Sequence, residues 1–509
     1  MDGILFSGGF TMSCVAEERM PDERFERLFN PRHLAIVGVS TRGSGFASGI
    51  MISLQAIGYE GTIYPVNPRG GMFLGKDLYK SIEAIPHEID FAIIAVPAGE
   101  VAKTLEACMK KGAVGAEILS AGFSELGTEE GVEMEKEIQA IAARGIRVIG
   151  PNCFGVYSPR SGLTLLPGPD LSRESGPVAF LSQSGGMSID YAHLGKWMGV
   201  RFSKVISFGN GADLRETELL RYLENDPETG VISMYTEGVK DGNVFFRALA
   251  DVARKKPVII FKGGLSEAGG RAVASHTASM GGNRVIWESL LHQCNAIQVR
   301  SLLEMAQVGL AFSMIPEGNY KNISVMGGGG ALGIAACDVA ERMNIGIPPL
   351  REDISESILD LLPKPGSSAK NPIDVANPHV APQILKEVLL RAAQDENIDL
   401  QIMIQLFYHY KVMARAMGIS VKEATPYLEL ADAVGDVVKT TGKPVVLVMP
   451  NIKQGMDSMD IEEMRRDARR AFLEKGVPVF DELEDVLRAV RHVSRYHKRK
   501  NDLVRAYAQ

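Results

Sequence analysis

Short apolar runs, each followed by a glycine-rich or polar turn and then by a longer amphipathic stretch, recur along almost the whole chain. Strands of a parallel sheet are buried on both faces, so in sequence they appear as near-continuous apolar runs separated by helical segments. The first group of such runs covers residues 33–40, 62–66, 90–97, 115–120 and 146–149. It predicts a mostly parallel α/β domain over residues 21–157.

Two further groups of apolar runs follow. The second group predicts an α/β domain over residues 158–318, and its runs cover residues 176–181, 204–208, 230–235 and 256–264. The third group predicts a similar domain over residues 319–509, and its runs cover residues 322–326, 371–374, 401–406, 444–449 and 478–480. Residues 1–20 lack this pattern and are expected to form a tail. The predicted fold class is therefore α/β, with three consecutive domains.

The composition is that of a globular protein, with 45% hydrophobic and 23% charged residues in 509. A net charge of −7 argues against a general nucleic-acid binder, and no apolar run is long enough to span a membrane. The first 20 residues lack the basic start and apolar block of a secretory signal. Five scattered cysteines lie at no metal-ligand spacing, which favours free thiols, no bound metal and a cytoplasmic location.

The first domain shows a candidate site for a phosphate-bearing ligand. Residues 33–40 run as a strand into the glycine-rich turn 41–49, and a helix follows from about Ile50. Strand, glycine turn and helix together direct backbone amides at phosphates. The next strand ends in Asn67-Pro68-Arg69, where a nicotinamide-binding domain usually has an acidic residue for the ribose. The arginine argues against the alternative of an NAD-dependent dehydrogenase.

In the second domain, four loops follow four predicted strands and are expected to meet at the carboxyl edge of one sheet, where ligands of open α/β sheets bind. They cover residues 182–188, 209–213, 236–242 and 263–282. The segment Ser182-Gln183-Ser184-Gly185-Gly186 opens a helix and offers amides and hydroxyls to an anion. An ordinary helix N-cap followed by small residues is the alternative interpretation.

His276 is the residue of most chemical interest, because it stands among glycines, alanines and small hydroxyl residues in the loop predicted at 263–282. Neutral imidazole is a competent nucleophile near pH 7, so this histidine could accept a phosphoryl group. Glu237 follows a strand toward the same edge. The alternative is a loop histidine that only forms local hydrogen bonds.

Together these motifs resemble those of the NDP-forming acyl-CoA synthetases, the family that includes the α subunit of succinyl-CoA synthetase. The resemblance covers about residues 25 to 495. Segments similar to the CoA-binding set are residues 36–38, 64–68, 96–97 and 150–153. Segments similar to the ligase set are residues 182–185, 209–213, 226–229, 235–238 and 275–277, and residues 371–374 look like the third domain. The implied order is a Rossmann-like CoA-binding domain followed by two flavodoxin-like ligase domains.

The resemblance implies an enzyme that interconverts acyl-CoA, phosphate and NDP with a small carboxylic acid, CoA and NTP through an acyl phosphate. In that scheme His276 carries the phosphoryl group and Glu237 orients His276. The implied phosphate-binding residues are Ser184, Gly185, Gly186, Ser275 and Thr277. The implied CoA-binding residues are Gly38, Ser40, Ser44, Gly45, Asn67, Pro68, Arg69, Val96, Pro97 and Asn152.

The sequence also departs from the family pattern. Ala278 stands where members commonly have glycine, Gly281-Gly282 replaces Ala-Gly, and Ile189 and Asp190 stand where the succinate branch has a tyrosine. Succinate is therefore not indicated as the acid.

The three predicted domains use the whole sequence, which leaves no room for a nucleotide-grasp domain. We therefore expect a separate β-type ATP-grasp subunit that holds ATP/ADP or GTP/GDP with Mg²⁺, and an αβ hetero-oligomer. The alternative is a non-catalytic CoA-binding regulatory or scaffold protein on the same fold.

Overall fold

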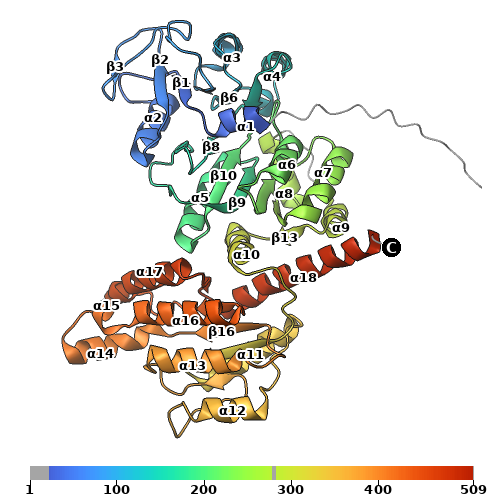
Figure 1. Cartoon of the computed structure of the whole chain (residues 1–509). Coiled ribbons are helices and arrows are strands. Elements are labelled where there is room, and N and C mark those ends of the chain that lie inside the picture. Colours follow the sequence, from blue (N-terminus) through green and yellow to red (C-terminus); the bar gives the residue numbers. More distant parts are fainter. Residues whose placement is uncertain (1–21, 278–282, 508–509) are drawn as a thin grey trace, which may run out of the picture.

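The computed structural model describes residues 22–277 and 283–507, which form three α/β units that follow one another along the chain (Figure 1). Each unit has a mostly parallel sheet with helices packed against it. The predicted α/β class is confirmed. The tail predicted at residues 1–20 lies outside the described residues.

The first sheet has five parallel strands in the order β2–β1–β5–β6–β7. These are β1 (His33–Val37), β2 (Thr62–Val66), β5 (Phe91–Ile94), β6 (Gly115–Ile118) and β7 (Arg147–Ile149). A two-stranded hairpin, β3 (Met72–Phe73) with β4 (Lys76–Asp77), lies beside them. The surrounding helices are α1 (Asp22–Phe29), α2 (Phe46–Ile57), α3 (Ala98–Lys110), η1 (Ser124–Leu126) and α4 (Glu129–Ala142). Buried residues of α3 and α4 share one hydrophobic cluster, and those of α1 and α2 share another with the second unit.

The second sheet has six strands in the order β13–β12–β11–β9–β10–β8, parallel except for β8. They are β8 (Gly155–Tyr157), β9 (Ser175–Ser182), β10 (Phe202–Ser207), β11 (Val231–Thr236), β12 (Val258–Lys262) and β13 (Ile297–Val299). The helices are α5 (Gly185–Met198), α6 (Glu216–Asn225), α7 (Gly242–Lys255), α8 (Glu267–Thr277), α9 (Arg284–Cys294) and α10 (Leu302–Met314).

The third sheet has five parallel strands in the order β15–β14–β16–β17–β18. They are β14 (Ile323–Gly327), β15 (Ile373–Asp374), β16 (Leu400–Ile404), β17 (Val445–Val448) and β18 (Val479–Phe480). The longer helices are α11 (Gly330–Arg342), α12 (Glu352–Leu359), α13 (Pro382–Ala392), α16 (Tyr427–Thr441), α17 (Met459–Glu474) and α18 (Leu483–Tyr507). Shorter ones are η2 (Phe407–His409), α14 (Tyr410–Met417), α15 (Val421–Ala424) and η3 (Met456–Ser458).

The first two units are joined by a polar seam. The Arg147 guanidinium binds the Asp213 carboxylate through contacts of 2.8 and 3.0 Å, and the backbone N–H of Val148 donates to the same carboxylate. Because β8 pairs with β10, residues 155–157 belong to the second sheet, although the boundary predicted at residue 157 would group them with the first. Their short apolar run gives no sign of which sheet it joins.

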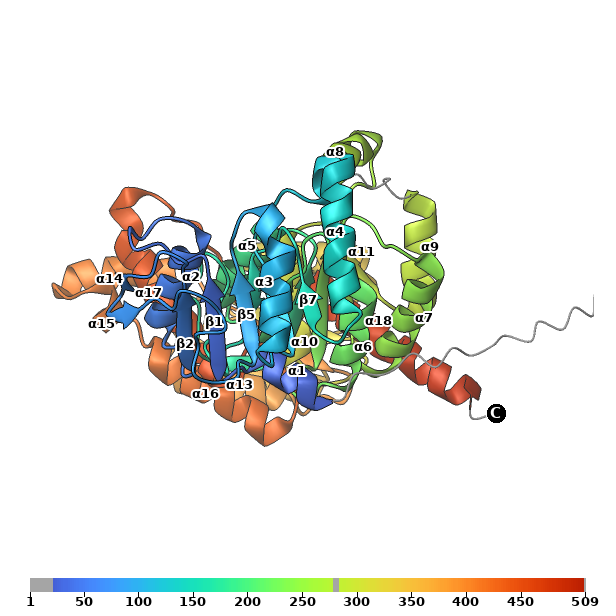
Figure 2. The ribbon, with the colours of Figure 1, turned by 90° about the horizontal axis from the view of Figure 1, so that it is seen from above.

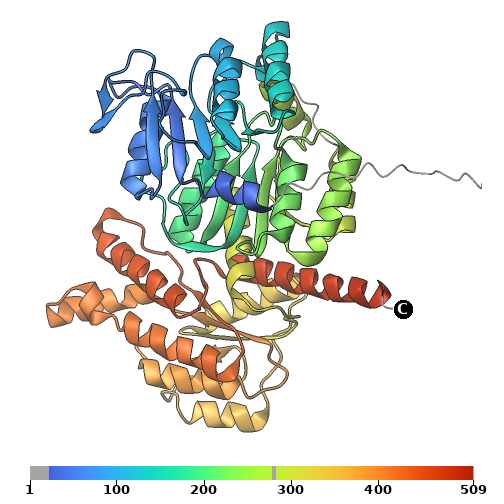
Figure 3. The same ribbon diagram turned by 45° about the horizontal axis from the view of Figure 1, so that its top comes forward.

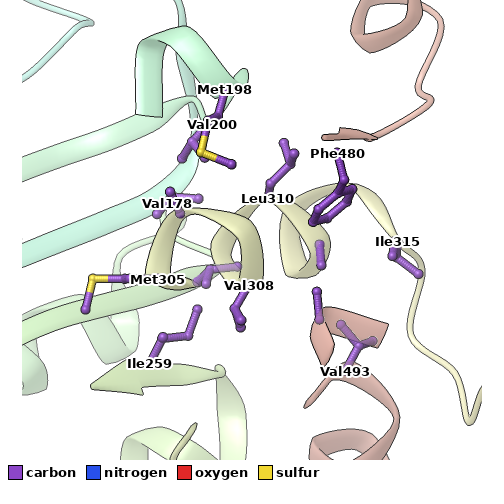
Figure 4. Close-up of a cluster of buried hydrophobic side chains, with 14 of the residues drawn as sticks. Val178, Met198, Val200, Ile259, Met305, Val308, Leu310, Ile315, Phe480 and Val493 are labelled. Atoms are coloured by element: carbon purple, nitrogen blue, oxygen red, sulfur yellow. The ribbon is translucent and has the colours of Figure 1, made fainter. Parts of the chain in front are cut away.

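The second and third units are held together by α10 and the long helix α18, which runs from the third unit back along the second (Figures 1 and 3). The side chain of Tyr496 in α18 donates to the carbonyl of Ala253, and Gln307 in α10 donates to Asp485 at 2.6 Å. Figure 4 shows apolar side chains of α10 between strands of the second sheet and residues of the third unit. The two units therefore share one hydrophobic core.

The loop predicted at residues 263–282 is in part helical, since residues 267–277 form α8. The hydroxyl of Ser266 accepts the N–H of Gly269 at 3.0 Å, as an N-cap does, and Gly270 N–H donates to the Ser266 carbonyl. The alanines that follow favour the helix. The expectation of a loop was wrong for residues 267–277. The glycines indicated a loop, although Ser266 before them caps a helix.

Candidate active site

The carboxyl ends of four neighbouring strands in the second unit bring four loops together. Strands β12, β11, β9 and β10 are parallel and adjacent, so the chain after each strand emerges at the same edge. This is the arrangement that the sequence predicted. It places the segment after β9, which opens α5, beside Glu237 at the end of β11.

The N-terminus of α5 is built from small residues. Ser184 is the N-cap, and its hydroxyl accepts the N–H of Met187 at 3.4 Å. Gly185 packs so closely on Phe154 that a Cβ would lie 2.7 Å from the ring, whereas a Cβ at Gly186 would meet nothing closer than 3.9 Å. Backbone N–H groups in the first turn have no acceptor within the helix. This end of α5 can therefore bind an anion.

Gln183 fixes the relative position of the β9 and β11 ends. Its side-chain oxygen accepts the N–H of Glu237 at 2.8 Å and that of Gly238 at 3.3 Å. The Thr236 hydroxyl lies 3.3 Å from this oxygen and 2.7 Å from the Gly238 carbonyl, to which it donates. The backbone that carries Glu237 is thus tied directly to the residue that precedes the α5 N-cap.

Glu237 is a buried carboxylate, 8% exposed, held by groups from its own strand and from β12. The hydroxyl of Tyr235 donates to its Oε1 at 3.2 Å, and burial together with this neighbouring carboxylate raises the pKa of Tyr235. The ammonium of Lys262 donates to the Glu237 carbonyl at 2.7 Å. Burial lowers the pKa of Lys262 to about 8.

A cavity of about 310 Å³ opens between these groups and the first unit. Of the predicted site residues, Ser184, Gly185, Gly186, Glu237 and Asn152 line it. The other lining residues are Ser124, Glu125, Glu135, Phe154, Gln183, Gly209, Asn210 and Arg215. The cavity is thus shared by the two units.

Asn210 bridges the units at this cavity. Its side-chain amide donates to the carboxylate of Glu125 at 2.6 Å and to that of Glu135 at 2.9 Å. The backbone N–H of Gly122 also donates to Glu125, at 2.6 Å. Although partial burial opposes it, hydrogen bonding from Asn210 and from backbone amides lowers the pKa of Glu125. Glu125 is therefore a carboxylate at neutral pH. Arg215 lines the same cavity, and its guanidinium donates to Glu216 and to the Asn210 carbonyl.

The helix α8 begins directly after β12 at this edge and contacts η1 of the first unit. Figure 2, seen from above, shows α8 next to α4. Ser275, His276 and Thr277 are its last three residues, and their side chains lie outside the described part of the structure. Ala278, Gly281 and Gly282 lie outside the described residues altogether.

The other predicted CoA-binding residues lie along the carboxyl edge of the first sheet, where β2, β1 and β5 are neighbours. Gly38 follows β1 with φ +105°, and a Cβ there would lie 2.3 Å from the Ala95 carbonyl oxygen, so only glycine fits. Gly45 is the N-cap residue of α2 and provides no side-chain cap. The backbone N–H groups in the first turn of α2 are therefore available to another hydrogen-bond acceptor.

Hydrogen bonds hold the turns of this edge in place. The Asn67 amide donates to the Val39 carbonyl at 2.7 Å, and its oxygen accepts the N–H of Arg69 at 2.9 Å. Ser40 N–H donates to the Ser48 hydroxyl, and the Ser120 hydroxyl donates to the Val96 carbonyl. The remaining predicted residues, Ser44, Pro68, Arg69 and Pro97, are exposed.

Several lining residues were not predicted as site residues. Gln183 and Asn210 stand inside the motifs at residues 182–185 and 209–213, so their polar side chains were an available signal. Glu125 and Glu135 come from another domain, and no local pattern indicates that they face this cavity. In residues 22–277 and 283–507, no group of three or more His, Cys, Asp or Glu side chains is placed to hold a metal ion. Nor does any described helix combine the length and apolar character needed to cross a membrane.

Comparison with known proteins identifies the family. Residues 32–159 match the model of a CoA binding domain, and residues 175–312 match that of a succinyl-CoA ligase like flavodoxin domain. The α subunit of ADP-forming acetate–CoA ligase II from Pyrococcus furiosus is 34% identical over 470 residues, which are 91% of this chain and 95% of that subunit. The chain belongs to the NDP-forming acyl-CoA synthetase family.

Other members of this family agree in fold and differ in length. The ADP-forming acetate–CoA ligase I of Archaeoglobus fulgidus is 31% identical over 93% of this chain, which spans only 64% of that longer protein. The solved structure of acetyl-coenzyme A synthetase 1 from Ca. Korarchaeum cryptofilum, in complex with phosphate and ADP, matches with a TM-score of 0.79 at 28% identity. That match covers 95% of this chain and 98% of the other.

Proposed function

We propose that this member of the synthetase family is an α-type subunit that interconverts acyl-CoA, phosphate and ADP with a carboxylic acid, CoA and ATP. The observation that carries the proposal is the convergence of the α5 N-terminus, Glu237 and the start of the His276 helix at one sheet edge. ADP is the nucleotide named for the relatives above, so it is preferred over GDP as the first acceptor to test.

The proposed reaction has three steps. A phosphate oxygen attacks the thioester carbonyl, the C–S bond breaks, and CoA leaves as the thiol after taking up a proton. An imidazole nitrogen of His276 then attacks the phosphorus of the acyl phosphate, and the carboxylate departs with the electrons of the P–O bond. Finally a β-phosphate oxygen of ADP takes the phosphoryl group and regenerates the histidine.

The chain's own groups suit the first two steps. The first-turn amides at Gly185 and Gly186, with Ser184, stabilise the negative charge of the phosphoryl oxygens, and Ser275 and Thr277 add hydroxyl donors beside the histidine. Glu237 accepts a hydrogen bond from the imidazole and fixes its tautomer. The Gln183 and Lys262 bonds to the Glu237 backbone keep that carboxylate in position.

CoA is assigned to the carboxyl edge of the first sheet. There the α2 N-terminus at Gly45 supplies amides, while Arg42 and Arg69 supply exposed positive charge for phosphates. The other proposed contacts are Gly38, Ser40, Ser44, Asn67, Pro68, Val96 and Pro97. Asn152 lies in the shared cavity and would be nearest to the thioester.

The nucleotide step is assigned to a β-type ATP-grasp partner that holds ADP and Mg²⁺. The name of the Pyrococcus furiosus relative as a subunit alpha supports a two-chain arrangement. Mg²⁺ would neutralise the nucleotide phosphates on that partner.

The test uses the chain alone, because its first two steps need no nucleotide. Purified chain is incubated with ³²P-phosphate and a panel of short acyl-CoA thioesters, and protein-bound label is measured after acid and alkali treatment. We expect an acid-labile, alkali-stable label that is absent in His276→Ala and retained in the exposed control His292→Ala. Glu237→Gln should slow labelling by about 100-fold, because the imidazole loses the carboxylate that fixes its tautomer and orientation.

The outcomes separate the alternatives. Label that persists in His276→Ala would refute the phosphohistidine assignment. CoA binding without label from any thioester, with and without an ATP-grasp partner, would instead indicate a non-catalytic CoA-binding protein.

A further inference from the structure

A second cavity, of about 570 Å³, lies between the second and third units, far from the residues assigned to catalysis. One wall is the C-terminal end of α5, and the other is α17. Cavities of roughly 300–1,000 Å³ are the size that holds small-molecule ligands. The proposed function uses none of the residues that line this one.

The cavity is positively charged in a chain whose net charge is −7. Two carboxylates, Glu174 and Glu474, face a larger set of cationic side chains. That set consists of Lys196, Arg201, Arg466, Arg469 and Arg470. A concentration of one charge sign in a concave site raises the local concentration of ions of the opposite sign.

Some of these cations already have protein partners. Arg466 binds Glu462 at 2.9 Å, and Arg469 binds Asp481 at 2.7 Å. Arg201 binds Glu174. The Lys196 ammonium donates to the backbone carbonyl of Asp170, which leaves its positive charge without a carboxylate partner. For Arg470 too, no carboxylate among the described residues lies within ion-pair distance. These two charges come from opposite walls, one on α5 and one on α17.

An aromatic ring accompanies the charges. Trp197 lines the cavity and is 37% exposed, which is unusual for a side chain of this size. The guanidinium of Arg469 lies 4.7 Å from the centre of its ring. Arg469 is only 4% exposed and donates to the Val479 carbonyl, so the guanidinium that packs against the indole is held in place. A fixed indole beside cations can stack a planar ring.

We propose that this cavity is a binding site for a nucleoside phosphate. The phosphates lie between Lys196 and Arg470, and the base stacks on Trp197. The 14-residue helix α5 is about 21 Å long, with Gly185 at the catalytic cavity and Lys196 and Trp197 at this one. A ligand held here therefore contacts the same helix whose other end is assigned to the phosphoryl group, and it bridges two domains.

Calorimetric titration of the full chain tests the site, with CoA in excess so that the adenine-binding edge of the first unit is occupied. The probes are ATP, ADP, adenosine and inorganic tripolyphosphate. We expect the nucleotides to bind and adenosine to bind much more weakly. Arg470→Glu should weaken nucleotide binding roughly tenfold or more, the loss of one charged contact. The exposed control Arg415→Glu on α14 should not change it.

Fluorescence gives an independent readout that does not depend on activity. The chain has two tryptophans, so in the variant Trp287→Phe the emission comes from Trp197 alone. Nucleotide should quench it, and Trp197→Ala should weaken binding of ATP without changing that of tripolyphosphate. A wild type that binds no nucleotide, or nucleotide binding unchanged in Arg470→Glu, overturns the proposal. Neither result bears on His276 labelling, so the two proposals fail separately.

Discussion

Glu117 is a buried acid in the middle of β6. Its Oε2 accepts the N–H of Val156 at 3.0 Å, which ties the first sheet to β8 of the second. Gly155 has φ +85°, and a Cβ there would lie 2.5 Å from Glu117 Oε1, so the carboxyl group is enclosed by backbone. Burial raises the pKa of Glu117 from 4.5 to about 8. In the folded chain it is therefore a neutral acid at pH 7.

This residue makes stability depend on pH. Between pH 4.5 and 8 the folded state keeps a proton on Glu117 that the unfolded state has released, so the free energy of unfolding falls as pH rises through that window. Glu117→Gln mimics the protonated acid, so it should remove this contribution to the dependence of the free energy of unfolding on pH. Urea denaturation at pH 5, 6, 7 and 8 measures it. The exposed Glu137→Gln should keep the wild-type slope, and a Glu117→Gln slope equal to wild type would contradict the expectation.

The convergence of candidate site residues was predictable where each of them follows a strand of one parallel sheet. Ser184, Gly185, Gly186 and Glu237 were expected to converge because parallel neighbours end at one edge, and they line one cavity. Glu125 and Glu135 were not predicted, since the surroundings of a carboxylate on one domain depend on how another domain docks. Sequence periodicity contains no information on that docking.

At the scale of elements, most strands that form buried apolar runs were predicted within a few residues, whereas other elements were not. Strands β8 and β13 were missed; each has three residues and forms an edge of the second sheet, where the burial that produces a long apolar run is incomplete. Helix α1 was missed because it has eight polar-rich residues, and α8 because two glycines stand in its first turn. In each case tertiary packing or a cap decides the structure.

The turn after β10 and the η1–α4 segment are the elements that close the candidate active site, and Asn210 joins them. Asn210→Ala removes the donor shared by Glu125 and Glu135 and leaves two carboxylates facing each other. We expect kcat/KM for acyl-CoA to fall roughly tenfold or more, because a hydrogen bond to a charged group is worth about 1.5–3 kcal/mol. Steady-state kinetics of the chain together with the proposed ATP-grasp partner measures this. Asn243→Ala, at an exposed position on α7, is the control. Equal kcat/KM of the two variants would mean that the hydrogen bonds of Asn210 between the two units are not needed for activity.

At the scale of the whole molecule, the second and third units are not independent domains. Val308 and Leu310 of α10 are buried in one cluster with Phe480 of β18 and Val493 of α18 (Figure 4). The outer layer of the first unit, formed by α3 and α4, has a cluster of its own. Domains joined by a continuous apolar core should open together, whereas the outer layer of the first unit should open separately.

Leu310→Ala tests this coupling. Leu310 is fully buried, and truncation of such a leucine typically costs about 2–5 kcal/mol. If the core is shared, amide hydrogen exchange should accelerate both in β12 of the second unit and in β16 of the third. The matched control is Leu105→Ala in α3, equally buried but in the first-unit cluster, which should accelerate exchange in β5 and β6 instead. If hydrogen exchange in Leu310→Ala accelerates in one unit only, α10 joins the two units along the chain without coupling their opening. Acceleration of exchange in both units would mean that they open as one cooperative unit, because α10 and α18 connect their apolar cores.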